Sequence, residues 1–418
     1  MIRNRPLRVA LVCDWYLPRV GGIETHVSDL ARQLAQAGHS VDIVTTVAGQ
    51  RAGTRVDARG TRTALRSPAG VRVVRLDVPL LPRVEIAIAP RTVAAVGDAL
   101  EAGCYDVVHC HTSVFSPLAF AGAYRAQALG LPCVVTHHSV LARSAHLFAA
   151  ADRVARWSRW PVLFSAVGPL VADEIRRMAP GLDVRVLPNA VHPHMWAARR
   201  RVLPPSGSGD GVVRVASVMR LAHRKRPHAL VAIAERVVAA LPSNVSVRFR
   251  IAGDGPARAA VERQIRRAGL HDVVELLGWR PRGALRALYE ESDLFVMPSV
   301  LESFGIAALE ARCAGLPVVA MRQAGPAGFV RHEREGLLAH DDADMAAQIV
   351  RLVTDDVLRR SIAHHNRGTV PAETWRAVLE RHEAFYADAM TLCGVTLPTV
   401  EVRPAPVPRR ARAASRLG

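Results

Sequence analysis

Short apolar runs alternate with longer amphipathic stretches along most of the chain. Short apolar runs bounded by turn residues indicate buried strands, whereas apolar residues at helical spacing indicate amphipathic helices. This alternation predicts parallel sheets assembled from β-α-β units. In the first half the predicted strands are 8–14, 39–45, 71–78, 106–111, 132–137, 162–167 and 184–187, and the predicted helices are 23–37, 90–102, 117–128 and 169–178.

A polar segment rich in proline, glycine and serine interrupts the pattern at residues 199–211. Because this composition cannot pack a core, we interpret it as a linker. A second alternation follows, with strands at 212–218, 245–252, 273–277, 294–297 and 317–321 and helices at 227–240, 256–268, 282–290, 304–314 and 344–354. The chain is therefore predicted to be an α/β protein of two Rossmann-like, doubly wound domains. Open parallel sheets bind ligands at the carboxyl ends of their strands, so the two domains should face each other across a cleft.

The predicted boundaries are an N-terminal domain at 1–198, the linker at 199–211 and a C-terminal domain at 212–370. Residues 371–396 contain a long helical stretch that could pack back across the hinge on the first domain. The final segment, 397–418, combines prolines, alanines and arginines with a single acidic residue. This composition predicts a disordered basic tail.

The composition is that of a globular protein, since half of the 418 residues are apolar. The six cysteines are dispersed and form no Cys-x-x-Cys pair, so we expect mostly reduced core thiols in a cytoplasmic protein. The apolar run near the N-terminus is too short for a signal peptide, and no stretch reaches the length of a transmembrane helix.

The net charge of +18 favours an anionic partner. Nucleic acid, an anionic membrane surface and a phosphorylated small molecule all fit, and charge alone does not choose among them. The basic segment 51–75 and the alternating arginines and tryptophans at 153–160 favour a membrane surface. The protein would then be peripheral on the inner face of the cell membrane. Ordinary solvated arginines explain the same residues at least as well.

Gly21 and Gly22 follow the first predicted strand and open the first predicted helix. Glycines at a helix N-terminus let backbone amides approach a phosphate or a sugar closely. The pair is not the Gly-x-Gly-x-x-Gly fingerprint of dinucleotide-binding proteins, which argues against an oxidoreductase. A plain tight turn accounts for two glycines equally well.

Two groups of histidines end predicted strands, His109 with His111 and His137 with His138. Strand ends line the cleft, so one of these imidazoles could donate to a sugar hydroxyl or relay its proton. A lone histidine is more often structural. Metal binding is less favoured, because neighbouring strand residues point to opposite faces and no carboxylate lies nearby to complete a ligand set.

The chain has a single lysine, Lys225, among 55 lysine and arginine residues, and it follows Arg220 in the loop after the strand at 212–218. Lysine supplies a compact point charge and arginine a bidentate donor, so the pair suits a diphosphate. Chance retention of one lysine is the competing explanation, with about equal weight on spacing alone. Gly253, in the turn after the next strand, either lets a base or phosphate approach or belongs to an ordinary turn.

Glu302 and Glu310 are separated by seven residues, with Glu302 in the loop after the strand at 294–297. Gly305 and its neighbours offer free amides at a helix start, which is an anion site. Glu310, about two turns farther along, could accept both hydroxyls of a ribose. An amphipathic helix can carry two glutamates at this spacing by chance, but the apolar neighbours of Glu310 make an unpartnered charge there costly.

Taken together, these residues resemble the retaining nucleotide-sugar glycosyltransferases of family 4, which have the GT-B fold. The resemblance runs from residue 7 to residue 390. Glu302-x7-Glu310 matches that family's signature, and Arg220 with Lys225 matches its donor-diphosphate pair. Gly21 and Gly22 match its N-terminal loop.

The resemblance also implies roles for individual residues. His137 matches the family's N-domain histidine near the anomeric centre. Arg220 and Lys225 would bind the diphosphate and Glu310 the ribose. The sugar and phosphate would lie near Glu302 and the amides of Phe304, Gly305 and Ile306.

Within the family the chain is most similar to the N-acetylglucosaminyl-phosphatidylinositol synthases, which implies a UDP-N-acetylglucosamine donor. Met219, Arg226 and the segment 321–326 depart from the usual pattern and leave the donor open. We therefore expect a hexose or N-acetylhexosamine to move from a nucleotide sugar to a lipid-linked or inositol-type (polyol) acceptor, with no metal or other cofactor and no nucleic-acid partner. The alternatives are a phosphatidylinositol mannosyltransferase-like enzyme using GDP-mannose and a non-catalytic basic protein that binds nucleic acid or a membrane surface.

Overall fold

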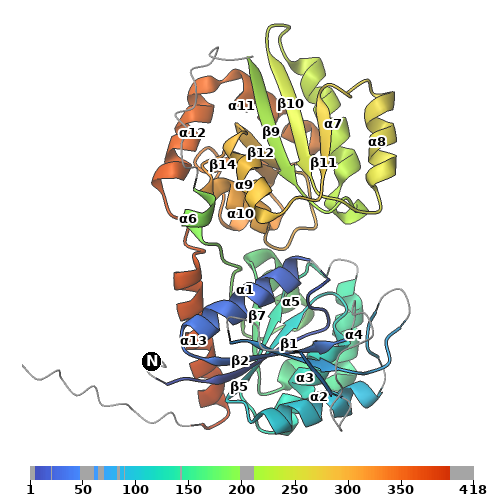
Figure 1. The fold of residues 1–418 in the computed structure, drawn as a ribbon, viewed down its shortest axis with the longest axis vertical. Helices are drawn as coiled ribbons and strands as arrows, with labels where there is room; N and C mark the ends of the chain where they lie inside the picture. Colours follow the sequence, from blue (N-terminus) through green and yellow to red (C-terminus); the bar gives the residue numbers. More distant parts are fainter. Residues whose placement is uncertain are drawn as a thin grey trace, which may run out of the picture.

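The computed structural model describes residues 5–19, 21–47, 61–64, 70–81, 85–88, 90–141, 144–197 and 211–395. Two separate sheets, one in each half of the chain, lie one above the other along the longest axis of the molecule (Figure 1). This arrangement confirms the predicted α/β class. The tail at 397–418, the linker apart from residue 211, and much of the basic segment 51–75 lie outside the described residues.

The first sheet has eight strands in the order β3-β4-β2-β1-β5-β6-β7-β8. All neighbours are parallel except β3 and β4, which are antiparallel. The order reverses direction at β1, so the strand ends at β1 and β5 border a natural ligand-binding crevice. The strands are β1 (Arg8–Cys13), β2 (Ser40–Thr46), β3 (Thr61–Ala64), β4 (Arg72–Leu76), β5 (Val107–Thr112), β6 (Cys133–His137), β7 (Leu163–Ala166) and β8 (Val184–Val186).

Helices cover both faces of this sheet. Proline occupies the first position of several of them, where its missing amide hydrogen leaves no helical bond unmade. The helical elements are α1 (Gly22–Gln36), α2 (Pro90–Gly103), α3 (Pro117–Ala128), α4 (Ala145–Ala155), the 3-10 turn η2 (Trp157–Arg159) and α5 (Pro169–Met178). The short helix α6 (Pro193–Trp196) lies instead with the second half, where Trp196 packs near Tyr289 (Figure 1).

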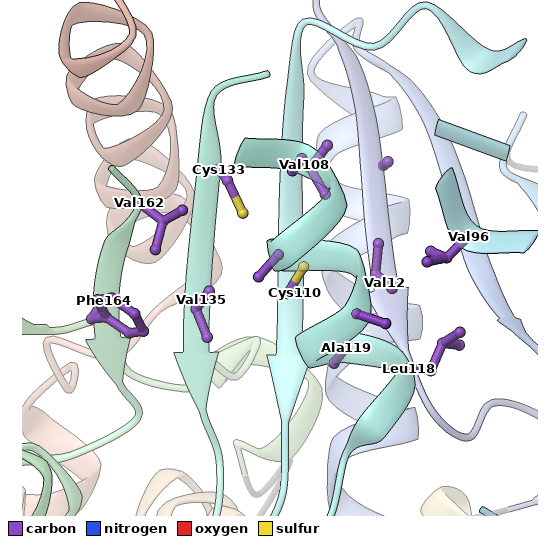
Figure 2. Close-up of a cluster of buried hydrophobic side chains, with 14 of the residues drawn as sticks. Val12, Val96, Val108, Cys110, Leu118, Ala119, Cys133, Val135, Val162 and Phe164 are labelled. Carbon is purple, nitrogen blue, oxygen red and sulfur yellow. The ribbon is translucent and has the colours of Figure 1, made fainter. Parts of the chain in front are cut away.

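Alternate side chains of the first sheet fill two different cores. Val12, Cys110 and Val135 point into the core that also takes Leu118 of α3 and Phe164 of β7 (Figure 2). Full burial of each such side chain contributes roughly 1.5–3 kcal/mol relative to exposure. The six cysteines are free thiols, and three of them are buried in these cores, whereas Cys104 is exposed.

The second sheet has six parallel strands in the order β11-β10-β9-β12-β13-β14. The strands are β9 (Val212–Val218), β10 (Ser246–Ala252), β11 (Val274–Gly278), β12 (Leu294–Met297), β13 (Val318–Met321) and β14 (Gly336–Ala339). The helical elements are η3 (His223–Lys225), α7 (Pro227–Ala240), α8 (Arg258–Arg267), α9 (Arg282–Glu290), α10 (Ile306–Cys313), η4 (Gly325–Gly328), α11 (Asp342–Thr354) and α12 (Asp356–Gly368).

Helix α13 (Trp375–Leu392) returns to the first half of the chain and lies beside it (Figure 1). Its side chains Trp375, Phe385 and Tyr386 join the core on the second face of the first sheet. The two chain segments that pass between the halves also pair with each other, since Val191 N donates to Glu373 O at 3.0 Å and Trp375 N donates to Val191 O at 3.1 Å. The last helix therefore ties the second half to the first.

No helix within the described ranges combines the length and the apolar character that crossing a membrane requires.

A buried hydrogen bond should anchor α13. The Tyr386 hydroxyl lies 3.0 Å from His109 Nδ1, and both side chains are buried. Tyr386→Phe keeps the ring and leaves that imidazole nitrogen without a partner, so the free energy of unfolding should fall by about 1–3 kcal/mol. Chemical denaturation followed by circular dichroism measures the change. Tyr124→Phe, at a residue that is 46% exposed, is the matched control and should leave stability unchanged.

Candidate functional site

The carboxyl ends of the two sheets meet at a narrow cavity between the halves. It offers about 30 Å³ of water-sized space, enough for one or two waters and far below the volume of a drug-sized ligand site. The two halves are therefore closed on each other. The lining comes from α1, α6, α9, α10, α13 and the β8–α6 loop, namely Thr25, His26, Asp29, Ala190, Val191, His192, Met195, Trp196, Arg282, Ile306, Glu310 and Trp375.

Polar contacts hold this closed arrangement. Asp29 of α1 forms an ion pair with Arg282 of α9 through two contacts of 2.5 and 3.4 Å. Arg224 Nη2 of η3 donates to Val140 O of the first half at 2.9 Å. Arg282 and Arg224 both belong to the second half, so its basic side chains bridge to acceptors of the first. Opening the cleft must break these bonds.

The predicted diphosphate lysine and the first glutamate of the spaced pair lie together. Lys225 Nζ is 2.6 Å from Glu302 Oε2, with Lys225 at the end of η3 and Glu302 in the loop after β12. The Glu302 side chain is 12% exposed and the Lys225 side chain 32% exposed. A partly desolvated ion pair of this kind presents a cation that an arriving phosphate can recruit from the carboxylate.

Arg220 lies on the same loop, five residues before Lys225, and is exposed. It makes no side-chain hydrogen bond or ion pair with any residue that the structure describes. Its charge acts on Glu24 at the start of α1, where it opposes the rise in the pKa of that carboxyl caused by burial. Arg220 is therefore exposed and available to an anion.

Gly253 shapes the Arg220 loop. It has a φ of +136°, and a Cβ there would lie 1.7 Å from the Met219 carbonyl oxygen. A side chain at this position would push the loop away from β10. The close approach that Gly253 permits is therefore made by the protein's own main chain next to Arg220.

Arg226, at which the sequence departs from the family pattern, makes structural contacts. Its guanidinium forms a bidentate ion pair with Asp342 at 2.9 and 2.6 Å and donates to Pro298 O at 3.0 Å. These bonds fix the end of η3 to the start of α11. They fix the position of the adjacent Lys225 and do not involve its ammonium group.

The 3-10 turn η4 packs against the Glu302–Gly305 loop. Gly325 N donates to Glu302 O at 2.8 Å, and a Cβ at Gly325 would lie 2.4 Å from Phe304 N. Gly305 adopts the left-handed conformation with φ of +91°, so α10 begins at Ile306. The Phe304 side chain is buried against Phe329, which leaves only its main chain for a ligand. The first amides of α10 have no helical acceptor and face the predicted anion site.

Glu310 lies on α10 in the lining of the cavity. Its Oε2 accepts a hydrogen bond from the Tyr289 hydroxyl at 3.4 Å. Burial raises the pKa of Glu310 to about 8, while Arg282 and the Tyr289 hydrogen bond act in the opposite direction. The carboxyl is therefore largely protonated at neutral pH when no ligand is bound.

The two glycines of the first half stand at the start of α1, as expected. A Cβ at Gly21 would lie 2.4 Å from Glu24 Oε2, so the space above this helix end holds the glutamate side chain. Gly22 has open space around its Cα. An anionic ligand at this end of α1 would have to displace Glu24.

His137 is interior, which corrects the expectation that it faces the reacting centre. Its Nδ1 lies 2.8 Å from Thr112 Oγ1, and its ring packs near Phe120 and Phe164 of the core beneath the sheet. Burial lowers its pKa to about 4, so the imidazole is neutral. The next residue, His138, is on the opposite face because side chains alternate along β6.

Several cavity residues carried no recognisable signal in the sequence. Arg282 and Asp29 of the lining, and Tyr289 behind Glu310, stand within ordinary amphipathic helices, and only the packing of α1, α9 and α10 brings them to Glu310. His26 lies four residues after Gly22. The glycine pair was recognised in the sequence, but no role was predicted for His26.

Two protein-family models match the two halves of the chain. Glycosyltransferase Family 4 matches residues 20–194, and Glycosyl transferases group 1 matches residues 201–368. Both sheets and the cavity between them lie within the matched region, apart from α13 and the first strand.

Curated relatives match over nearly the whole chain. The phosphatidylinositol N-acetylglucosaminyltransferase subunit of Arabidopsis thaliana is 27% identical, covering 92% of this chain and 82% of the relative. A D-inositol 3-phosphate glycosyltransferase of Acidothermus cellulolyticus is 29% identical, covering 92% and 91%. A GDP-mannose-dependent alpha-mannosyltransferase of Mycolicibacterium smegmatis is 28% identical, covering 90% and 95%.

Solved structures share the fold. The sucrose-phosphate synthase of Thermosynechococcus elongatus superposes with a TM-score of 0.70 at 21% identity, covering 92% of this chain and 99% of that one. Anabaena HepE in complex with UDP and glucose superposes with a TM-score of 0.68 at 19% identity, covering 91% and 100%. With both halves matched and the two-sheet architecture shared, this chain belongs to the family 4 glycosyltransferases of GT-B fold.

Proposed function

We propose that this glycosyltransferase retains anomeric configuration and moves N-acetylglucosamine from UDP-N-acetylglucosamine to a lipid-linked or inositol-type acceptor. The observation that carries the proposal is the Lys225–Glu302 ion pair at the carboxyl edge of the second sheet, with Glu310 farther along the helix that follows. A cation, a helix N-terminus and a partly buried carboxyl in this order suit a diphosphate and a ribose.

Binding of the donor would rearrange the ion pair. The diphosphate takes Lys225 from Glu302 and also recruits the exposed Arg220. Glu302 is then free to accept hydrogen bonds from sugar hydroxyls, and the first amides of α10 receive a phosphate oxygen. These cationic and amide groups supply the positive charge at the diphosphate, so we expect donor binding to need no metal.

The transfer step follows from the same positions. The acceptor hydroxyl attacks the anomeric carbon from the face that the diphosphate leaves, and the leaving phosphate oxygen takes the hydroxyl proton. Lys225 and Arg220 stabilise the negative charge that grows on the diphosphate as the bond breaks. No enzyme carboxylate needs to form a bond to the sugar.

The choice of donor and acceptor rests on the relatives. Curated relatives from a plant, human and fission yeast are by name phosphatidylinositol N-acetylglucosaminyltransferase subunits, and others are by name inositol 3-phosphate glycosyltransferases. The GDP-mannose-dependent relative supports the second candidate, a mannosyltransferase on a phosphatidylinositol-type acceptor.

A lipid acceptor calls for a surface that meets a membrane, and we propose that α4 is that surface. Leu147 and Val154 of this helix are 54% and 88% exposed, and Arg153 and Arg156 are exposed beside them. Apolar side chains flanked by arginines suit an interface with anionic lipid. Trp157, in contrast, is buried and belongs to the core.

Nucleotide binding tests the proposed donor site. UDP and UDP-N-acetylglucosamine should raise the melting temperature of the metal-free protein more than GDP and GDP-mannose do, because a ligand that binds only the folded state stabilises it. Lys225→Ala should weaken the binding roughly tenfold to 100-fold, the loss of one charge-assisted hydrogen bond. Arg266→Ala, an exposed change on α8, should not alter the shift. A melting temperature that no nucleotide moves would overturn the proposal, and a larger shift with GDP-mannose would favour the second candidate.

The affinity for UDP should depend on pH through Glu310. The carboxylate accepts ribose hydroxyl protons better than the carboxyl does, so with a pKa of about 8 the dissociation constant should increase by up to tenfold per unit as pH falls below 8. Isothermal titration calorimetry between pH 6 and 9 measures it. Glu310→Gln should bind more weakly than the wild type at pH 9 and show a flatter profile. Identical pH profiles for the two proteins would remove Glu310 from the nucleotide site.

Vesicle binding tests the α4 surface. Leu147→Asp together with Val154→Asp should weaken cosedimentation with vesicles that contain phosphatidylinositol by more than tenfold, since two apolar side chains together contribute roughly 3 kcal/mol. Val357→Asp, at an 80% exposed residue of α12, is the matched control and should leave binding unchanged. Equal vesicle binding by the double variant and the wild type would show that α4 is not the membrane surface.

A further inference from the structure

Three buried histidines converge in the first half of the chain. His26 comes from α1, His111 from β5, and His138 from the residue just after β6. Their exposures are 4%, 1% and 5%. One ring nitrogen of each lies within 4.8 Å of the corresponding nitrogens of the other two.

The strand-alternation argument against a metal fails for this trio. Alternation separates His137 from His138, but it places His111 and His138 on the same side of two neighbouring strands, and α1 brings His26 from above. The three side chains come from elements far apart in the sequence, so no spacing rule could have shown the group.

The polar atoms of this trio are incompletely satisfied. His26 Nδ1 and His111 Nε2 are buried and have no hydrogen-bond partner in the part of the chain that the structure describes. The bond between the rings, His111 Nδ1 to His138 Nε2 at 2.9 Å, uses a single hydrogen between two nitrogens. Buried polar atoms are nearly always paired, so the orphaned His26 Nδ1 is consistent with a partner that the trio would share.

Imidazole is a common metal ligand, and in its neutral form each ring of the trio has one nitrogen lone pair to offer.

Neighbouring groups hold the rings in place without competing for the same role. His109 uses both of its nitrogens, with Tyr386 at 3.0 Å and Thr136 at 2.7 Å, so it is not a fourth ligand. Its ring lies against that of His111, with centroids 4.1 Å apart, and Trp375 stacks on His26 at 5.6 Å. Fixed orientation of ligand rings strengthens metal binding.

We propose that His26, His111 and His138 bind a divalent transition-metal ion, for which zinc is the best fit. Three imidazoles without a carboxylate favour zinc and its borderline neighbours over magnesium or calcium, which prefer oxygen ligands. The ion takes the place of the hydrogen between His111 Nδ1 and His138 Nε2. That hydrogen moves to the far nitrogen of the ring that carried it, so each of the two rings keeps one hydrogen. Three protein ligands leave a fourth position, and His26 lines the interdomain cavity, so water or an anionic oxygen can complete the site.

None of the three ligands is a residue of the proposed donor site, and of the three His26 shares the cavity with Glu310. The ion would join α1 to the ends of β5 and β6, beneath α13. Since it binds the folded arrangement only, it should also stabilise the first half of the protein.

Cobalt and zinc titrations of the full chain test the proposal. After treatment with a chelator, the protein should take up one equivalent of Co²⁺ with the strong visible bands of a four-coordinate site and without a thiolate charge-transfer band. Zn²⁺ should displace the cobalt and raise the melting temperature. Competition with a chromophoric chelator gives the zinc dissociation constant.

Single variants locate the ligands. His26→Gln, His111→Gln and His138→Gln should each weaken zinc binding by about 100-fold or more, beyond the loss typical of outer-shell changes. His192→Gln is the matched control, because His192 lines the same cavity and lies outside the trio. Circular dichroism checks that each variant is folded. If a variant does not fold, X-ray absorption of the zinc-loaded wild type replaces it and should show three imidazole ligands.

Three results would overturn the proposal. The first is failure of the wild type to bind zinc or cobalt tighter than millimolar. The second is a thiolate band or sulfur scattering, which would assign the metal to cysteines. The third is an equal loss of affinity in His192→Gln and in the trio variants.

Discussion

The return of α13 to the first half is the constraint on which the rest of the arrangement depends. The chain crosses between the halves twice, and the two crossings pair through Val191 and the segment from Glu373 to Trp375. Trp375 and Tyr386 then become part of the first core, so moving the second half strains a helix that is packed elsewhere. The carboxyl edges of the two sheets are consequently held opposite each other, where neither sheet alone could enclose a ligand.

The approach of the carboxyl edges of the two sheets also determines the electrostatics of the cleft. Each strand end brings polar side chains into a space that excludes water, so charged forms become costly there unless they are paired. Asp29 and Lys225 are charged and have partners at Arg282 and Glu302. Glu310 and the buried histidines have weaker partners or none. Burial therefore raises the pKa of Glu310 and lowers that of His26, which in each case favours the neutral form.

Much of the fold could be predicted from the sequence because its local signals were strong. Helices at Pro117–Ala128, Pro169–Met178, Pro227–Ala240 and Arg282–Glu290 begin and end where the pattern placed them, since a proline at or just before the first position marks each start. The short strands β3 and β14 and the helices α4 and α12 were not predicted. A four-residue strand carries little periodicity, and α12 follows α11 with only Asp355 between them, where that side chain caps the new helix by accepting from Leu358 N.

The positions of some residues of the candidate site are determined by the local sequence, and the positions of others depend on long-range packing. Lys225 and Glu302 were proposed as site residues because each follows a strand end, and Glu310 because it lies on the helix that begins after Glu302. The local pattern predicts all three positions. The face occupied by a residue at the strand end itself is harder to assign. His137 was therefore expected at the cleft, although its side chain lies in the core beneath the sheet. The cavity depends on α1, α9 and α13 meeting from three distant parts of the chain. Local sequence constrains the side of this cleft that carries Lys225 and Glu302, while long-range packing creates the histidine-lined side.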